Sequence, residues 1–194
     1  MSTRRKKDGN YSRSWKFLKQ IKNYVYISIA LFFVFAIFGF IFPVFFKDEI
    51  LSFVKNITAQ ISNYNLPELI SFIFLNNLKA SFFAMLLGVI FGFFPVITAI
   101  INGYLVGFVA KYAVSEGGLF VLWKLLPHGI FELPAVLISI GMGLRLGRDL
   151  IRTGKEKDIL KKDFMECMRL FLFIIIPLLL IAAVIEGTLI FVLR

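Results

Sequence analysis

Apolar stretches of about membrane thickness alternate with short polar connectors along most of the chain. A helix needs about 20 apolar residues to cross a hydrocarbon core of roughly 30 Å, and five stretches come close to or exceed that length. We therefore predict an all-α membrane protein with five transmembrane helices. Residues 1–22 are expected to form a basic cytoplasmic N-terminal arm and residues 23–194 a polytopic membrane domain. The expected spans are residues 24–46, 78–94, 96–113, 119–146 and 170–193.

The connector after the first span has the pattern of an amphipathic helix. Ile50, Phe53, Ile57 and Ile61 recur at helical spacing between residues 47 and 66, with charged and amide side chains among them. We predict an interfacial helix on the membrane surface. A helix packed against the bundle would give the same pattern, and that alternative stays open.

The fourth span contains two helix-breaking segments, Pro127-His128-Gly129 and Glu132-Leu133-Pro134. Proline removes a backbone donor and clashes with the preceding turn, so we expect this span to be a broken helix. Irregular backbone at membrane depth is tolerated only inside protein or beside water. The segment is therefore expected to face the bundle interior.

Composition supports the membrane assignment and excludes a water-soluble monomer, since 59% of the residues are hydrophobic and mean hydropathy is +0.83. The single cysteine, Cys167, excludes an internal disulfide. Of the 22 Lys and Arg, 16 lie in residues 1–22 and 145–169, which a five-span chain places on the same side. The positive-inside rule then predicts a cell-membrane protein with a cytoplasmic N-terminus and an external C-terminus. For a net charge of +10 arranged in this way, anionic lipid headgroups are the expected partner, and nucleic acid is not.

Two carboxylates, Glu132 and Glu186, lie within apolar sequence, where a charge costs several kcal/mol, roughly 2.5 to 3.5 on insertion scales. His128 precedes Glu132 by four positions and would share a helix face with it. His128, Glu132 and Glu186 are therefore a candidate metal, ion or proton site, and a cation is the candidate cofactor. The alternative is that the imidazole and carboxylate only satisfy backbone groups freed by a helix break.

Amides extend this candidate intramembrane polar site, because Asn76, Asn77 and Asn102 lie within or near the second and third spans. Interhelical hydrogen bonds that hold the bundle together would explain the same amides.

Glycines form three G-x-x-x-G pairs, which allow helices to approach closely in lipid. We predict tight helix packing and a homo-oligomer, with a dimer as the default. The pairs are Gly88 and Gly92, Gly103 and Gly107, and Gly143 and Gly147.

Catalytic signatures are missing from the sequence. It contains no Walker A loop, dinucleotide fingerprint, nucleophile elbow or zinc-protease motif. We expect that the protein is not an enzyme.

Three strings carry a family resemblance: NNLKASFFAMLLGVIFGFFPVITAIINGYLVG, LLPHGIFELPAVLISIGMGLRLG and the terminal AAVIEG. They resemble the stage II sporulation protein M family over residues 74–187. The resemblance implies a small integral membrane protein, found in spore-forming bacteria and in bacteria and archaea that make no spores. The named member works with partner membrane proteins that remodel peptidoglycan, but nothing here encodes a wall-binding domain. Matching positions are Asn76, Asn77, Asn102, Gly103, His128, Gly129, Glu132, Pro134 and Glu186.

Two functions of different class follow from these observations. The first is an oligomeric channel or transporter-like protein whose buried polar residues line an ion or solute path. The second is a non-catalytic scaffold that positions envelope-protein partners. The carboxylates and the histidine exceed the polarity that packing requires, which favours transport.

Overall fold

The computed structural model describes residues 9–90, 93–153 and 157–193, except for the side chains of residues 89–90, 123–128, 153 and 157. Within these ranges every regular element is helical and there is no strand. Eight elements are α-helices, η1 is a 3-10 helix and η2 is a π-helix. In chain order they are α1 (Asn10–Gln20), α2 (Lys22–Ile41), α3 (Lys47–Ile61), α4 (Leu66–Ile90), α5 (Phe94–Gly117), η1 (Leu119–Leu125), α6 (Leu126–Thr153), α7 (Lys157–Leu170), η2 (Phe171–Ile175) and α8 (Ile176–Val192).

Five helical segments are long and apolar enough to cross a membrane, which confirms the predicted fold class. The amphipathic helix predicted after the first span is also present as α3. The second, third and fifth spans run longer than expected, because polar residues at their ends continue the helices, whereas the first and fourth are shorter than expected. The five segments are Lys22–Ile41, Leu66–Gly88, Phe94–Gly117, Gly129–Arg152 and Asp158–Val192.

The second span begins earlier than predicted because of a helix cap. Helix α4 begins at Leu66 and not near residue 78, because Asn65 and Glu68 form a capping box. The backbone N–H of Asn65 donates to Glu68 Oε2 at 2.9 Å, and the N–H of Glu68 donates to Asn65 Oδ1 at 3.0 Å. The cap places Asn76 and Asn77 inside the helix.

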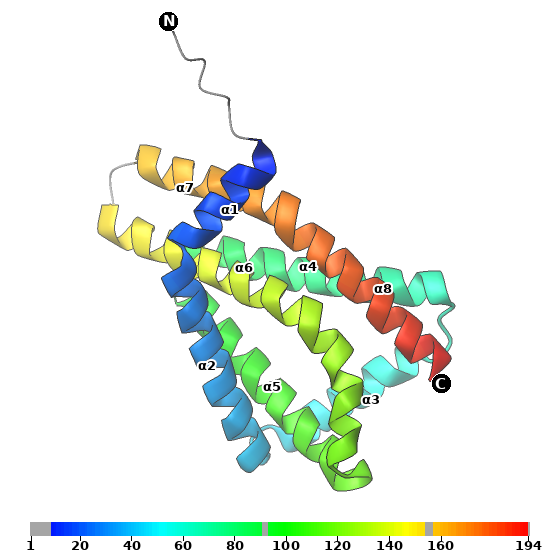
Figure 1. Cartoon of the computed structure of the whole chain (residues 1–194). Helices are drawn as coiled ribbons and strands as arrows, with labels where there is room; N and C mark the ends of the chain where they lie inside the picture. The colour runs from blue at the N-terminus through cyan, green and yellow to red at the C-terminus, as the bar shows by residue number, and fades with distance from the viewer. Residues whose placement is uncertain (1–8, 91–92, 154–156, 194) are drawn as a thin grey trace, which may run out of the picture.

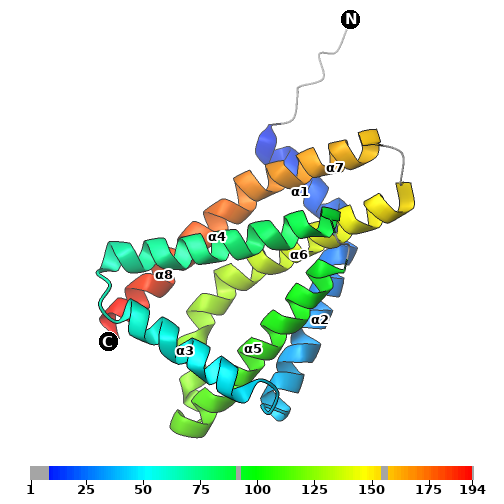
Figure 2. The same cartoon turned by 180° about the vertical axis from the view of Figure 1, so that it is seen from behind.

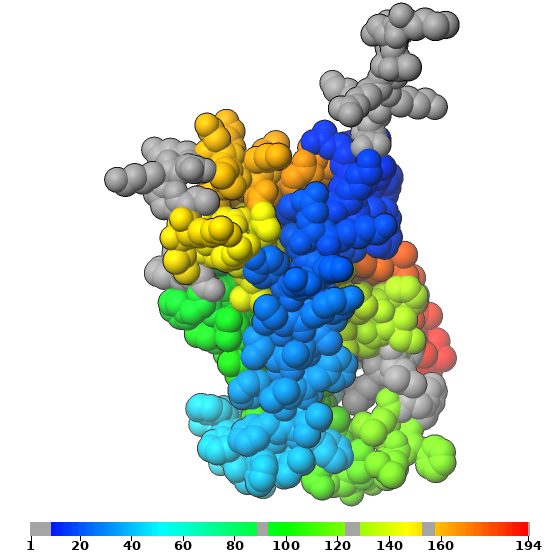
Figure 3. All heavy atoms as spheres, turned by 60° about the vertical axis from the view of Figure 1, so that its left-hand side comes forward, coloured from blue at the N-terminus to red at the C-terminus, as the bar shows by residue number. Residues whose placement is uncertain are grey.

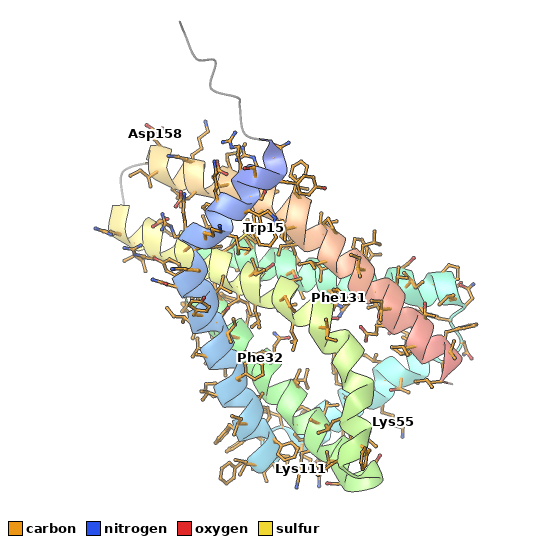
Figure 4. All side chains as sticks on the ribbon, in the orientation of Figure 1. Trp15, Phe32, Lys55, Lys111, Phe131 and Asp158 are labelled. Atoms are coloured by element: carbon orange, nitrogen blue, oxygen red, sulfur yellow. The ribbon has the colours of Figure 1, made fainter. Side chains whose placement is uncertain are left out.

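The interruption expected in the fourth span takes the form of a bend in a continuous helix. The 3-10 helix η1 ends at Leu125, and α6 then runs through Pro134 to Thr153. Pro134 removes the N–H that would bond the carbonyl of Ile130, which is the usual cause of a kink. Figure 1 shows α6 changing direction along its length, and the bend lies near Phe131 in Figure 4.

Glycines bring α2 and α5 into backbone contact. A Cβ atom at Gly103 would overlap the carbonyl oxygen of Phe32, and one at Gly107 would overlap that of Ala36. From the other helix, a Cβ atom at Gly39 would overlap the carbonyl oxygen of Tyr104. No larger side chain fits here without separating the helices.

Helices α4 and α6 meet in the same way. A Cβ atom at Gly88 would overlap the backbone of Gly143, and one at Gly143 would overlap the carbonyl oxygen of Ala84. Gly147 is buried on α6, whereas Gly92 lies outside the described residues. Both interfaces therefore fix helix positions at the backbone level.

The predicted basic arm is partly folded onto the bundle. Helix α1 packs against α7, and its Phe17 and Ile21 are buried in the main hydrophobic core. Figure 3 shows the atoms of α1, in dark blue, lying against those of α6 and α7. Residues 10–20 are thus part of the membrane domain's structure.

Helix α6 is the centre of the bundle and contacts α2, α4, α5 and α8. The pair α2 and α5 lies on one side of it and the pair α4 and α8 on the other. Figures 1 and 2 show the two pairs diverging toward the end where α3 crosses from one pair to the other. This divergence is where the candidate site lies.

Candidate functional site

A cavity of about 370 Å³ lies between the diverging helix pairs. Among the described side chains, its polar lining consists of three amides and two carboxylates from four helices, and the rest of the described lining is apolar. The amide pair comes from α4, the third amide from α5, and one carboxylate each from α6 and α8. These residues are Asn76, Asn77, Asn102, Glu132 and Glu186. The structure thus brings five of the six predicted polar residues to one space.

Helical spacing explains how each element presents its residues. On α4, Ile73, Asn76, Asn77 and Ala80 lie three or four residues apart and share one face, which faces the cavity. The same spacing relates Asn102 to Val106 on α5, Glu132 to Val136 on α6, and Glu186 to Ile190 on α8. The cavity therefore follows from the 3.6-residue repeat and the divergence of the helices.

A buried polar contact joins α4 to α6 at the cavity wall. Asn77 Nδ2 donates a hydrogen bond to Glu132 Oε2, and both residues are only 8% exposed. A hydrogen bond to a carboxylate stabilises more than one between neutral groups, typically by about 1.5 to 3 kcal/mol. The pair thus positions a carboxylate in the bundle interior.

The other polar residues are less enclosed. Glu186 and Asn102 are half-buried, whereas Asn76 is exposed. Asn102 Nδ2 donates to the carbonyl of Thr98 one turn earlier at 2.8 Å, which directs its side chain along its own helix. The lining therefore has a buried part at Asn77 and Glu132 and a more open part at Asn76.

Helix α3 covers one side of the cavity with apolar side chains. Phe53, Ile57 and Ile61 line the space, yet no residue of α3 is buried. Figure 2 shows α3 crossing in front of the gap between α4 and α5. The sequence predicted this helix but gave no sign that its apolar face would line a polar cavity.

The turn before α3 is held by one tyrosine of α5. Tyr104 Oη accepts a hydrogen bond from the backbone N–H of Phe45 at 2.9 Å and donates to a carbonyl in the same turn. Phe46, which ends the turn, has a φ of 54°, an uncommon left-handed conformation for a residue with a side chain. These hydrogen bonds fix the start of α3, whereas the middle of the helix meets the bundle through side chains that line the cavity.

His128 lies outside the residues whose side chains are described, so its convergence with Glu132 and Glu186 stays a prediction. Among the described residues, no three His, Cys, Asp or Glu side chains are grouped to hold a metal ion. What the described geometry does show is that Glu132 and Glu186 line the same cavity.

A second polar centre, which we call the ionic cluster, lies where α1, α6 and α7 meet. Arg145 contacts Asp149 at 2.8 Å and Asp163 at 2.7 Å, and both carboxylates are buried. Arg13 contacts Glu166 at 2.9 Å, and Arg169 contacts the other oxygen of Glu166. From the sequence, only the basic residues of these segments entered the prediction, as the charge asymmetry that sets orientation, although the four-residue spacing of Arg145 and Asp149 indicates a pair. The ionic cluster consists of Arg13, Arg145, Asp149, Asp163, Glu166 and Arg169.

Two archaeal proteins of Methanocaldococcus jannaschii are similar to this chain. The uncharacterized protein MJ0793 is 32% identical over 173 residues, covering 84% of this chain and 90% of the relative. The uncharacterized protein MJ0706 is 28% identical over 144 residues, covering 71% of this chain and 63% of the relative. No solved structure matches the chain significantly.

The family match covers every polar residue of the cavity described above. Residues 28–189 match the family described as stage II sporulation protein M, a range that extends from α2 into α8. With that extent of match, the chain belongs to the stage II sporulation protein M family.

Proposed function

We propose that the protein is a membrane transport protein, channel or transporter-like, in which the cavity between α4, α5, α6 and α8 binds a cation or a hydrogen-bond-donating solute. One observation carries this proposal. Five polar side chains from four helices line one cavity between the spanning helices. Transporters characteristically place their binding sites between helices near the middle of the membrane.

The free-energy cost of a carboxylate inside the membrane distinguishes this proposal from the alternative of a scaffold that positions envelope partners. Close packing in this bundle is supplied by glycines such as Gly103, Gly107 and Gly143. A buried carboxylate such as Glu132 is not needed for that close contact and is expensive in the membrane. Ionisable residues in spanning helices usually mark paths for ions or protons, so the cavity favours transport.

The chemistry of the lining indicates the class of substrate. Carboxylate and amide oxygens are ligands for hard cations and acceptors for donor-bearing solutes. The carboxylates of Glu132 and Glu186 also create a negative potential that attracts cations and repels anions. We therefore expect cation transport in preference to anion transport.

Access to the cavity would be controlled by α3. Its cover consists of Phe53, Ile57 and Ile61, while its ends are attached to α2 and α4 by short turns. Because no residue of α3 is buried, moving its middle away disrupts few contacts. Such a movement would open the cavity at the end of the bundle that contains α3.

The orientation we propose is a cytoplasmic N-terminus and an external C-terminus. The Arg13–Glu166 ion pair and the packing of α1 on α7 support it, because they bring the two basic segments to one end of the bundle. Figure 1 shows the C-terminus at the opposite end of the rod formed by α7, η2 and α8. Labelling of Asn10→Cys and Thr188→Cys by an impermeant thiol reagent should occur from opposite sides. Labelling from the same side would contradict the proposal.

A homo-oligomer, by default a dimer, completes the proposal. The close-packing glycines Gly88, Gly103, Gly107 and Gly143 are engaged between helices of this chain, so a contact between copies would use other surfaces. Mass measurement in native-like lipid should give a multiple of 22.2 kDa, and a monomer at all concentrations would contradict it.

Flux through proteoliposomes tests the transport proposal. The full chain would be reconstituted and assayed with sodium, potassium, magnesium, calcium and chloride. We expect protein-dependent flux of at least one cation, reduced about tenfold or more by Glu132→Gln. The matched control is Glu116→Gln, which removes an exposed carboxylate at the end of α5 and should leave flux unchanged. Wild-type protein that carries no cation would favour the scaffold.

A further inference from the structure

A second cavity, of about 520 Å³, lies at the other end of the bundle between α1, α6 and α7. Its wall carries four basic side chains, an amide, two carboxylates and two apolar residues. We propose that this pocket, here called the basic pocket, binds a phosphate group, and that its natural ligand is the headgroup of an anionic phospholipid. The basic pocket is lined by Arg13, Lys16, Phe17, Gln20, Arg145, Ile159, Lys162, Asp163 and Glu166.

The charges of the basic pocket leave an excess of cations. Its two carboxylates are already held by arginines, Asp163 by Arg145 and Glu166 by Arg13. Each guanidinium has five N–H donors, more than these contacts use. Lys16 and Lys162 add two further positive charges to the wall. An anion entering the pocket therefore meets donors that the ionic cluster has oriented in advance.

The position of the basic pocket selects a ligand at the membrane surface. Helix α1 carries exposed aromatic residues, Tyr11 and Trp15, of the kind that sit at headgroup level. The ring of Tyr11 packs 5.4 Å from that of Phe173, at the start of the apolar part of the fifth span. Figure 4 shows Trp15 near the place where α1 crosses α7. The pocket thus opens near the depth where lipid phosphates lie.

The shape of the wall also suits a lipid. Phe17 is buried beneath the basic residues, and Ile159 gives the wall a second apolar residue, partly exposed. A headgroup can place its phosphate against the lysines and its glycerol region against these apolar residues. Inorganic phosphate would use only the polar half of the pocket.

A pair of double variants distinguishes this pocket from general attraction between a basic surface and an anionic membrane. Lys16→Gln with Lys162→Gln removes two charges from the wall without touching the arginine–carboxylate pairs. Lys19→Gln with Lys161→Gln removes two exposed charges from the same two helices, outside the pocket. The two proteins have equal net charge.

Lipid retention would be measured by native mass spectrometry of the full chain released from phosphatidylcholine nanodiscs containing phosphatidylglycerol. We expect the pocket variant to weaken phosphatidylglycerol binding by about tenfold or more and the control by less than about threefold, since charge-assisted hydrogen bonds are lost only in the first. Equal weakening in both variants, or no bound phosphatidylglycerol in the wild type, would overturn the proposal.

A second arm identifies the source of the phosphate. Inorganic phosphate would be titrated into the wild type and both double variants in pure phosphatidylcholine nanodiscs, with melting temperature as the readout. We expect millimolar phosphate to stabilise the wild type little and phosphatidylglycerol to stabilise it clearly. Stabilisation by inorganic phosphate alone, lost only in the pocket variant, would overturn the lipid assignment and establish a soluble phosphate ligand.

Discussion

The cavity and the ionic cluster handle buried carboxylates in different ways. In the ionic cluster, Asp149 and Asp163 are held by the guanidinium of Arg145. In the cavity, Glu132 accepts a hydrogen bond from a neutral amide, that of Asn77. Both sites use residues of α6, and Glu132 lies about three and a half turns before Arg145. The ionic cluster fixes the fold through charged partners, whereas the proposed transport function requires that a ligand reach the carboxylate of the cavity.

The ionic cluster should show the largest effect on stability. Arg145→Gln leaves two buried carboxylates without their guanidinium, which costs about 3 kcal/mol of unfolding free energy or more. We expect the melting temperature in detergent to fall by roughly 10 °C. Arg148→Gln is the control, because Arg148 is exposed and bonds only the hydroxyl of Tyr24 at 2.6 Å among the described residues. Equal losses of stability in the two variants would contradict the claim that the ionic cluster fixes the fold.

The two carboxylates of the cavity should act as one unit. Glu132→Gln and Glu186→Gln are each expected to reduce cation flux about tenfold, because they line the same space. In the double variant, the loss should be well short of the product of the single losses, as for residues that share a ligand. Melting temperatures should change little, since glutamine can still accept the hydrogen bond from Asn77. Fully multiplicative losses would show that the two residues act separately.

The cover formed by α3 can be tested through its two faces. Modifying Ile57→Cys with a bulky thiol reagent should reduce flux several-fold, because residue 57 lines the cavity. Lys55→Cys is the control, since Lys55 is exposed and does not line the cavity, and Figure 4 labels it on α3. The native Cys167 is fully buried and should stay silent in this assay. Inhibition from position 55 but not from position 57 would contradict the assigned orientation of α3.

Asn102 should give the smallest effect. Its amide nitrogen is bonded to the carbonyl of Thr98 at 2.8 Å, so its contribution to a ligand rests on the amide oxygen. Asn102→Ala is expected to reduce flux about threefold and to change the unfolding free energy by less than about 1 kcal/mol. Flux assays and thermal melts would check both values. A larger loss of flux than in Glu132→Gln would move the centre of the site toward α5.

Much of the fold could be predicted from the chain because the bilayer imposes strong constraints on it. Apolar length predicted the five spans, amphipathic spacing predicted α3, and proline chemistry placed the irregularity in the fourth span. Helix ends were less predictable, since the capping pair Asn65 and Glu68 extends α4 well beyond its apolar part.

The site was predictable only in part. The cost of polar groups in lipid singled out Asn77, Glu132 and Glu186 without any structure. That Phe53 and Ile57 would cover them, and that Asp163 would meet Arg145, depends on contacts between segments distant in sequence. Periodicity within one helix carries no information on such contacts.

Infrared difference spectroscopy of the full chain in lipid, with carbon-13-labelled glutamate, tests the central claim most directly. Adding the transported cation should shift a glutamate carboxylate band in the wild type and in Glu116→Gln. The shift should be lost in Glu132→Gln, because the cation is proposed to bind in the cavity that Glu132 lines. A shift that persists unchanged in Glu132→Gln, or transport of a cation without any glutamate shift in the wild type, would contradict the account.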